Sequence, residues 1–144
     1  MITIRTANPN DDKCLCALFR QLGYALTREE VGEKLNGVGS YGHLLVAESA
    51  GTLHGAIAFH FITPFHDAGQ WCVISALVID EATRGAGIGR QLLLETERYA
   101  LEAGCSRIEL ACNEKRINAH YFYEKNGFRE VRKRFIKRLS GAAG

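Results

Sequence analysis

The stretch that decides the fold runs Arg84-Gly85-Ala86-Gly87-Ile88-Gly89. An apolar run from Val73 to Ile79 precedes it, and a helical pattern starts near Ile88, so its glycines join a strand to a helix N-terminus. Backbone N–H groups at a helix start lack intrahelical acceptors and carry the positive end of the helix dipole, and glycines let an anion approach them. The stretch predicts a site for a diphosphate group, with a plain structural turn as the alternative.

The same turn argues against the two common nucleotide-binding motifs. No Lys-Ser or Lys-Thr pair follows Gly89, as a P-loop would need, and the glycines are spaced G-x-G-x-G rather than G-x-G-x-x-G. The turn also follows the fourth expected strand, and no ribose-binding acid stands on a strand about 20 residues later. Neither a nucleotide triphosphatase nor a Rossmann domain is therefore favoured.

A second motif follows further along the chain, Ala119-x-x-Phe122-Tyr123-x-x-x-Gly127-Phe128. Together with Arg84-x-x-Gly87-x-Gly89, in this order and spacing, it resembles the GCN5-related N-acetyltransferase (GNAT) superfamily. The resemblance spans residues 70–138, and the N-terminal half matches only in layout. A finer pattern, Asn113-x-x-Arg116-x-x-Ala119-His120-x-Phe122-Tyr123 with the tail Arg134-Phe135-Ile136-Lys137, is similar to the branch that contains aminoalkylphosphonate N-acetyltransferases.

The resemblance implies acetyl-CoA as co-substrate and assigns residues to it. The diphosphate would bind the amides from Gly85 to Arg90, with Arg84 adding a positive charge, and the pantetheine arm would pair with free backbone groups around Val78. For Asn113, a polar turn cap is the alternative role. The expected cofactor-binding residues are Val78, Ile79, Arg84, Gly85, Ala86, Gly87, Ile88, Gly89, Arg90, Asn113 and Asn118.

The resemblance also implies a catalytic residue, Tyr123, whose hydroxyl would donate to the departing thiolate. The alternative is a packing role, because Ala119, Phe122, Tyr123 and Asn126 share one helical face. Many family members carry a glutamate as general base on the fourth strand, and Ser75 stands at that position here. The alternatives for the base are His66, Asp67, Glu48, or a water molecule ordered by Ser75. No metal site is expected, although His60, His66 and Asp67 offer suitable ligand types.

Composition indicates one globular domain, residues 1–144, with 47% hydrophobic residues for its core. No apolar stretch approaches the length of a membrane span, and the N-terminus lacks the regions of a signal peptide, so we expect a cytoplasmic protein without a membrane partner. The five cysteines include no C-x-x-C pair and fall within apolar patterns, which predicts buried, reduced thiols.

Positive charge gathers near the C-terminus, where residues 129–138 hold six basic residues and one acidic residue. A solvated strand face is the ordinary explanation, and attraction of an anionic substrate or of the cofactor phosphates is the functional one. No stacking aromatic residues interleave with these charges, so nucleic acid is not the expected partner.

Periodicity predicts the order of the elements. The expected strands are residues 2–5, 43–48, 53–62, 71–79, 107–112 and 128–139, and the expected helices are residues 8–22, 28–36, 88–103 and 116–126. This order predicts an α/β fold in which a mixed, mostly antiparallel sheet of six to seven strands carries helices on both faces. In the family, the strands ending near Ile79 and Cys112 are parallel neighbours that splay apart around the pantetheine arm.

The sequence therefore predicts an N-acetyltransferase that moves an acetyl group from acetyl-CoA to a primary amine of a small molecule by direct attack. If the phosphonate-like branch is the right one, the amine is anionic and is held by some of Arg116, Arg132 and Arg134. A non-catalytic acyl-CoA-binding module and a peptide or protein N-acetyltransferase remain alternatives. Edge strands of so small a sheet can pair, so a homodimer is also open.

Overall fold

The computed structural model describes residues 1–111, 117–131 and 134–139. The chain divides into two compact units, Met1–Leu110 and Ala111–Gly144, and each unit is described by itself.

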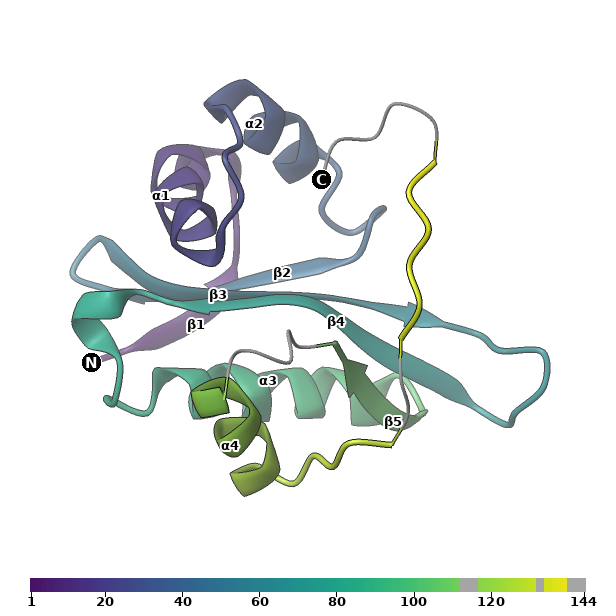
Figure 1. Cartoon of the computed structure of the whole chain (residues 1–144). Coiled ribbons are helices and arrows are strands. Elements are labelled where there is room, and N and C mark those ends of the chain that lie inside the picture. The colour runs from purple at the N-terminus through teal and green to yellow at the C-terminus, as the bar shows by residue number, and fades with distance from the viewer. Residues whose placement is uncertain (112–116, 132–133, 140–144) are drawn as a thin grey trace. The chain divides into compact units, whose positions relative to one another are not determined.

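The N-terminal unit is built on a five-stranded sheet with the order β1-β2-β3-β4-β5 (Figure 1). The first four strands pair in antiparallel fashion, and β4 and β5 pair in parallel. The strands are β1 (Thr3–Thr6), β2 (His43–Ser49), β3 (Thr52–Ile62), β4 (Gln70–Ile79) and β5 (Cys105–Leu110).

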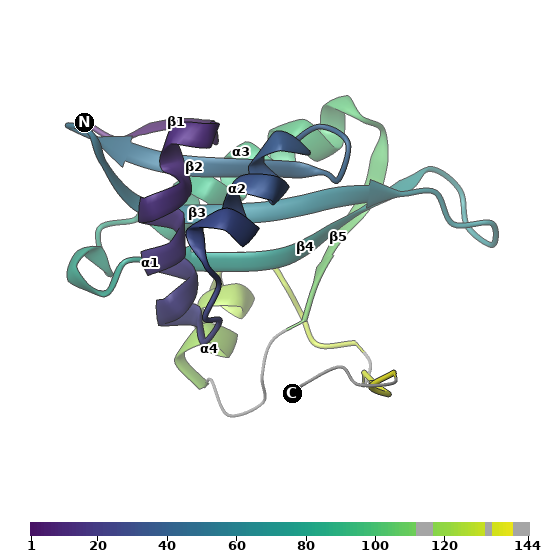
Figure 2. The same ribbon diagram turned by 90° about the horizontal axis from the view of Figure 1, so that it is seen from above.

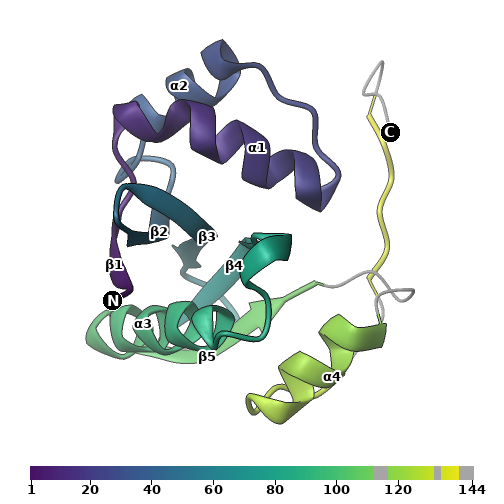
Figure 3. The ribbon, with the colours of Figure 1, turned by 90° about the vertical axis from the view of Figure 1, so that its left-hand side faces the viewer.

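Helices cover both faces of this sheet. α1 (Asp12–Leu22) and α2 (Arg28–Asn36) lie on one face, and α3 (Ile88–Glu102) lies on the other (Figure 3). The start of each of the first two helical segments is fixed by its sequence. Asn8 caps a short 3₁₀ turn, η1 (Pro9–Asp11), that leads into α1, and Thr27 forms a capping box with Glu30 at the start of α2.

Two groups of apolar side chains hold the layers together. On the face of α1 and α2, the buried residues are Ala7, Leu15, Cys16, Leu18, Val31, Leu35, Val46, Leu53, Ala56 and Val78. On the other face, Tyr99 of α3 packs edge-on against Phe59 and His43, with ring centroids 5.6 and 5.3 Å away. The strand that carries Val78 is thereby anchored in the core.

The hairpin of β3 and β4 extends past the neighbouring strands (Figure 2). Near its tip, the indole Nε1 of Trp71 donates to Asp67 over 3.3 Å, and the Arg107 guanidinium lies 3.5 Å above the Trp71 ring. The tip lies at the first residues of β4, whereas the glycine turn follows its last. Trp71 and Ile79 stand eight positions apart on β4, a separation of about 26 Å along the strand.

The C-terminal unit contains α4 (Ile117–Lys125), and Gly127, two residues past its end, has φ +94°. The expected strand over residues 128–139 is wrong for the residues described there, which carry no strand. Described residues therefore form five strands, fewer than the six to seven expected. The apolar positions Val131, Phe135, Ile136 and Leu139 explain the failure, because their spacing does not give the continuous period of two that one buried strand face needs.

The expectation that the cysteine thiols are buried is confirmed for only some of the described cysteines. Cys16 and Cys72 are buried and Cys105 is half-buried, but Cys14 is exposed, because it stands on the solvent side of α1. Cys112 lies outside the described residues. No helix in the described part of the chain is both long and apolar enough to cross a membrane.

Candidate active site

The candidate site begins where β4 leaves the sheet. After Ile79, the chain passes through a 3₁₀ turn, η2 (Glu81–Thr83), in which the Thr83 N–H donates to the Asp80 carbonyl over 3.0 Å. Arg84 is extended, with φ −62° and ψ 142°, and Gly87 is the N-cap residue of α3. The glycine turn therefore connects a strand to a helix N-terminus, as its sequence predicts.

Several backbone N–H groups of this turn have no acceptor. The Gln91 N–H donates to the Gly87 carbonyl over 3.1 Å and closes the first helical turn of α3. In the described residues, no acceptor faces the N–H groups of Gly85, Gly87, Ile88, Gly89 and Arg90. The Ala86 N–H differs, because it donates to the Thr83 carbonyl over 3.3 Å. A row of amides at the start of α3 is thus available to an anion.

Glycine is needed here for backbone conformation. Gly85 and Gly87 have φ of +89° and +80°, which side chains other than glycine rarely adopt. A Cβ atom added at either position would meet no other atom within 4 Å. The space above the turn is therefore open, and the positive φ values are what the glycines supply.

The charges around the turn also favour an anion. Arg84 and Arg90 are exposed, and the described residues offer neither of them an acidic partner. The first turn of α3 carries no acidic residue and no side-chain cap. Nothing in the described structure thus competes with a ligand for the positive end of the helix.

A β-bulge interrupts β4 upstream of the turn. Phe59 of β3 pairs with Ile74, and Ala58 pairs with Ala76, so Ser75 is an extra residue on β4. The Ser75 side chain is exposed, and its hydroxyl donates to the Ala58 carbonyl over 3.4 Å. The sequence offers only one signal for this bulge, a lone polar residue within the apolar run.

The same strand has an open edge beyond the bulge. β4 pairs with β5 from Gln70 to Ile74, and the pairing in the described residues ends there, while pairing with β3 continues to Ile79. Alternate residues of the segment Ala76–Ile79 therefore direct backbone N–H and C=O groups away from β3, where an extended ligand can bind them. Val78, which is 4% exposed, fixes this segment to the core.

Gly55 on β3 is needed for the close pairing of β3 with the end of β4, and it is not among the residues expected from the sequence. It pairs with Ile79, and a Cβ atom there would lie 3.0 Å from the Val78 carbonyl oxygen and 2.9 Å from Ile79 Cδ1. Glycine therefore lets β3 approach the end of β4 closely. A glycine within a strand pattern is the signal that could have pointed to it.

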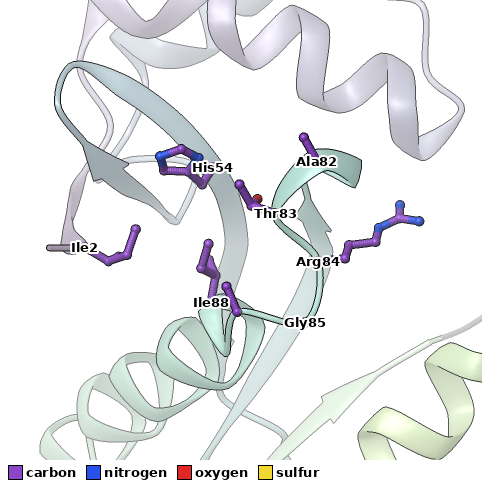
Figure 4. A pocket seen from close by; sticks show the side chains of 8 residues that line it. Ile2, His54, Ala82, Thr83, Arg84, Gly85 and Ile88 are labelled. Carbon is purple, nitrogen blue, oxygen red and sulfur yellow. The ribbon is translucent and has the colours of Figure 1, made fainter.

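An open pocket of about 420 Å³ borders the turn. Ile2, His54 and Ile88 direct their side chains toward it, whereas the Arg84 side chain points away from Ile2 and His54 (Figure 4). The buried Nδ1 of His54 has no hydrogen-bond partner in the described residues. This hollow lies toward β1 and β3, so it is distinct from the open edge of β4, and we do not assign the diphosphate to it.

Tyr123 belongs to the C-terminal unit. It lies on α4 between two aromatic neighbours, with ring centroids 5.5 Å from Phe122 and 5.9 Å from Phe128. Its carbonyl accepts the N–H groups of Asn126 and Phe128 at 3.0 Å, which closes the end of the helix. Tyr123 is half-buried while Tyr121 is 68% exposed, in agreement with the helical face expected from the sequence.

The other expected cofactor contacts are Asn113 and Asn118. Asn113 lies outside the described residues, as do Arg116 and Arg132. Asn118 is exposed in the first turn of α4.

The other three candidates for the general base do not lie on the open edge of β4. His66 and Asp67 lie at the tip of the hairpin, where the His66 ring packs edge-on against Trp71. The Glu48 carboxylate, on β2, accepts from Arg5 Nε over 2.9 Å. Of the residues considered from sequence, Ser75 alone lies beside the open edge of β4.

A cysteine nucleophile is disfavoured by the surroundings of the two thiols of β4 and β5. Burial raises the pKa of Cys72 to about 12, with the neighbouring Cys105 adding to the shift, and burial also raises the pKa of Cys105. At neutral pH both remain thiols rather than the nucleophilic thiolates. In the described residues, no group of three or more His, Cys, Asp or Glu side chains gathers in a way that could hold a metal ion.

Two known proteins are similar to this chain in sequence. Aminoalkylphosphonate N-acetyltransferase of Salmonella typhimurium is 34% identical over 126 residues, covering 87% of this chain and 80% of that protein. Glucosamine 6-phosphate N-acetyltransferase of Trypanosoma brucei brucei is 38% identical over 56 residues, covering 39% of this chain and 36% of that protein.

The fold also matches solved structures. An aminoglycoside N-acetyltransferase in complex with CoA superposes with a TM-score of 0.84 at 14% identity, covering 97% of this chain and 95% of that one. The family model for the acetyltransferase (GNAT) family matches residues 12–128. This match spans the helices on both sheet faces, the open edge of β4, the glycine turn and α4. The chain therefore belongs to the acetyltransferase (GNAT) family, a family of acetyl-transferring enzymes.

Proposed function

We propose that the protein transfers an acetyl group from acetyl-CoA to the primary amine of a small molecule that carries a phosphonate or phosphate group, by direct attack of the amine. The observation that carries this proposal is the row of amides without acceptors from Gly87 to Arg90, which follows the open edge of β4 in the chain after the short turn η2. The amides at the start of α3 suit a diphosphate, and the open edge of β4 suits an extended chain with amide groups.

The residues that would hold acetyl-CoA fit its chemistry. The amides of Gly85 and of Gly87–Arg90 donate to phosphate oxygens, and the Arg84 guanidinium adds a charge. Around Val78 and Ile79, backbone C=O groups would accept hydrogen bonds from the amides of the pantetheine arm, and backbone N–H groups would donate to its carbonyls. Asn113 and Asn118 are further proposed contacts. When bound, the co-substrate supplies an activated thioester carbonyl for attack by an amine.

We propose that the β-bulge at Ser75 contributes to the reaction. A bulge leaves ladder N–H groups unpaired, and such a group beside Ser75 can donate to the thioester carbonyl oxygen as negative charge develops on it. The amine must arrive without its extra proton. Because His66, Asp67 and Glu48 lie elsewhere, we assign proton removal to water that the exposed Ser75 hydroxyl orders.

Tyr123 is the proposed donor to the departing thiolate. A tyrosine hydroxyl has an ordinary pKa of about 10 and a thiol about 8.5, so complete proton transfer to sulfur is slightly uphill in water. The hydroxyl therefore acts mainly by donating a hydrogen bond that stabilises the developing negative charge. The motif carries this assignment, and the half-buried position of the residue on α4 is compatible with it.

The acceptor class is supported by the two relatives. One is named for aminoalkylphosphonates and the other for glucosamine 6-phosphate, and both compounds join an amine to a phosphorus oxyanion. The basic segment 129–138 supplies positive charge for such a group, and Arg134 in it is exposed. We propose that Arg134, together with Arg116 and Arg132, attracts the anionic end of the acceptor.

The test combines binding and turnover. Calorimetry with CoA should give saturable heat, and acetyl-CoA consumption should be measured with matched amine pairs, 2-aminoethylphosphonate against ethanolamine and glucosamine 6-phosphate against glucosamine. We expect the anionic member of at least one pair to be turned over with at least tenfold higher kcat/KM. Binding without turnover of any amine would favour the non-catalytic module. Turnover of peptide N-termini alone would favour a peptide N-acetyltransferase.

A further inference from the structure

A side chain of α1 bonds the segment that leads into the glycine turn. Gln21 stands in the last turn of α1, and its Nε2 donates to Asp80 Oδ1 over 2.9 Å. Its Oε1 accepts the backbone N–H of Glu81, also over 2.9 Å. Asp80 directly follows β4, and Glu81 begins η2. One carboxamide thus links the layer of α1 and α2 to the exit of the strand that carries the candidate site.

The chemistry of these two bonds requires a carboxamide. The carboxylate of Asp80 only accepts and the N–H of Glu81 only donates, so the group between them must donate at one end and accept at the other. Glutamine does both with a planar group. A glutamate would lose the donor and face Asp80 with like charge, and an alanine would leave both partners to water. The same pairing also fixes which end of the carboxamide is nitrogen.

On the side of the sheet, one backbone bond to β3 holds this segment, and a side-chain bond within η2 supports it. The Asp80 N–H donates to the His54 carbonyl over 2.8 Å, and the Thr83 hydroxyl donates to the Asp80 carbonyl over 3.2 Å. These bonds fix Asp80 at the end of β4 and close η2. The Gln21 carboxamide adds the contact with α1, three residues before the exposed Arg84 and six before the N-cap Gly87.

We propose that Gln21 is a positioning residue for the acetyl-CoA site. It holds Asp80 and Glu81 against α1, and thereby sets the direction in which Arg84 and the amides at the start of α3 face. This inference rests on the proposed function. Because Gln21 and Glu81 are exposed, water replaces the lost bonds at little cost to folding, so the effect should appear in the order of the turn and in acetyl-CoA affinity.

The first test uses Gln21→Ala with Lys13→Ala as its control, since Lys13 is an exposed residue on the same helix. Gln21→Ala should raise the KM for acetyl-CoA at least threefold, with kcat within twofold of wild type and a melting temperature matching that of Lys13→Ala. Hydrogen exchange at residues 80–90 of the ligand-free protein should become faster. Wild-type KM and wild-type exchange in Gln21→Ala would overturn the inference.

The second test is a rescue. Gln21→Glu should weaken acetyl-CoA binding more than Gln21→Ala, because two carboxylates then face each other. Combining Gln21→Glu with Asp80→Asn should return the KM toward wild type, since the new amide at position 80 donates to the new carboxylate at position 21. A double variant no better than Gln21→Glu would count against the pairing.

The two proposals fail in different ways. A wild-type protein that binds no acetyl-CoA would remove the proposed function, and with it the cofactor role of Gln21. A wild-type protein that binds and turns over acetyl-CoA while Gln21→Ala behaves like Lys13→Ala in every readout would remove the inference about Gln21 alone.

Discussion

Gly87 and Gln91 are joined by the first hydrogen bond of α3, in which the Gln91 N–H donates to the Gly87 carbonyl over 3.1 Å. Between them lie Ile88, Gly89 and Arg90, whose N–H groups have no acceptor in the described residues. These N–H groups without an acceptor thus all lie within the first turn of the helix, next to the Gly87 carbonyl that accepts its first hydrogen bond. An anion that binds there is held by main-chain groups, so substitutions act on it through backbone conformation.

Gly87→Ala should therefore impair acetyl-CoA binding. The residue has φ +80°, which costs an alanine about 1–2 kcal/mol, although its methyl group would meet open space. If the turn changes conformation to relieve this cost, the KM for acetyl-CoA should rise about tenfold. The matched control is Gly32→Ala, a helical glycine in α2 that also has open space around it. That change should raise stability by about 0.5–1 kcal/mol and leave the KM unchanged. Equal KM values in the two variants would contradict the assignment.

Arg84→Gln should weaken acetyl-CoA binding in a way that depends on salt. The exposed guanidinium has no acidic partner in the described residues, so it is available to a phosphate. We expect a KM about threefold to tenfold higher at low ionic strength, and a smaller difference at high ionic strength because salt screens exposed charges. Arg98→Gln is the control, since Arg98 pairs with Glu95 and Glu102 on the outside of α3. A loss that does not change with salt would argue for a structural role of Arg84.

Tyr123→Phe should lower kcat about 100-fold while leaving the affinity for acetyl-CoA close to wild type. The change removes only the hydroxyl, so the ring contacts with Phe122 and Phe128 remain. Tyr121→Phe, at an exposed position of the same helix, should have wild-type kcat. The measurement is steady-state kinetics with calorimetry of CoA binding. A wild-type kcat in Tyr123→Phe would show that the hydroxyl has no catalytic role and that the residue only packs.

Asp11→Asn should destabilise the protein in a pH-dependent manner. Asp11 is 7% exposed and accepts from both terminal nitrogens of Arg5 at 2.9 Å, and this pairing holds its pKa below the usual range. The ion pair thus adds stability above the unfolded pKa of about 4, and that stability is lost as the pH falls through the lower folded value. We expect the variant to lose about 2 kcal/mol at pH 7.

The pH dependence is measured by denaturant unfolding from pH 7 to pH 3. The gap between wild type and Asp11→Asn should be constant at neutral pH and close in the acid range. Asp12→Asn removes a more exposed pairing, with Arg28, and should have a smaller effect at every pH. A gap that stays the same down to pH 3 would show that the Arg5 pairing is not its source.

Local signals in the sequence predicted most of the elements. Asn8 with Pro9, the capping box from Thr27 to Glu30, and the glycine turn before Ile88 act within a few residues, so each fixes its helix start without help from the rest of the chain. The fold class followed from the order of these elements. The expectation that helices cover both faces of a mixed, mostly antiparallel sheet was confirmed.

The features that shape the site depend on pairing between distant strands. The bulge at Ser75 is a shift of β4 against β3, and the open edge beyond Ile74 is the end of pairing with β5. Neither follows from local periodicity, because a strand with an extra residue has nearly the same pattern as one without. The expected strand over residues 128–139 is wrong for a local reason, because the apolar residues of this segment do not alternate with the basic ones.

The most direct test of the central claim is amide NMR of the labelled protein during titration with CoA and, separately, with pantetheine, which lacks the diphosphate. We predict that the backbone N–H signals of Gly87, Ile88, Gly89 and Arg90 shift on addition of CoA and stay in place with pantetheine at the same concentration. Signals that do not move with CoA, or that move equally with both compounds, would contradict the binding of a diphosphate at the start of α3.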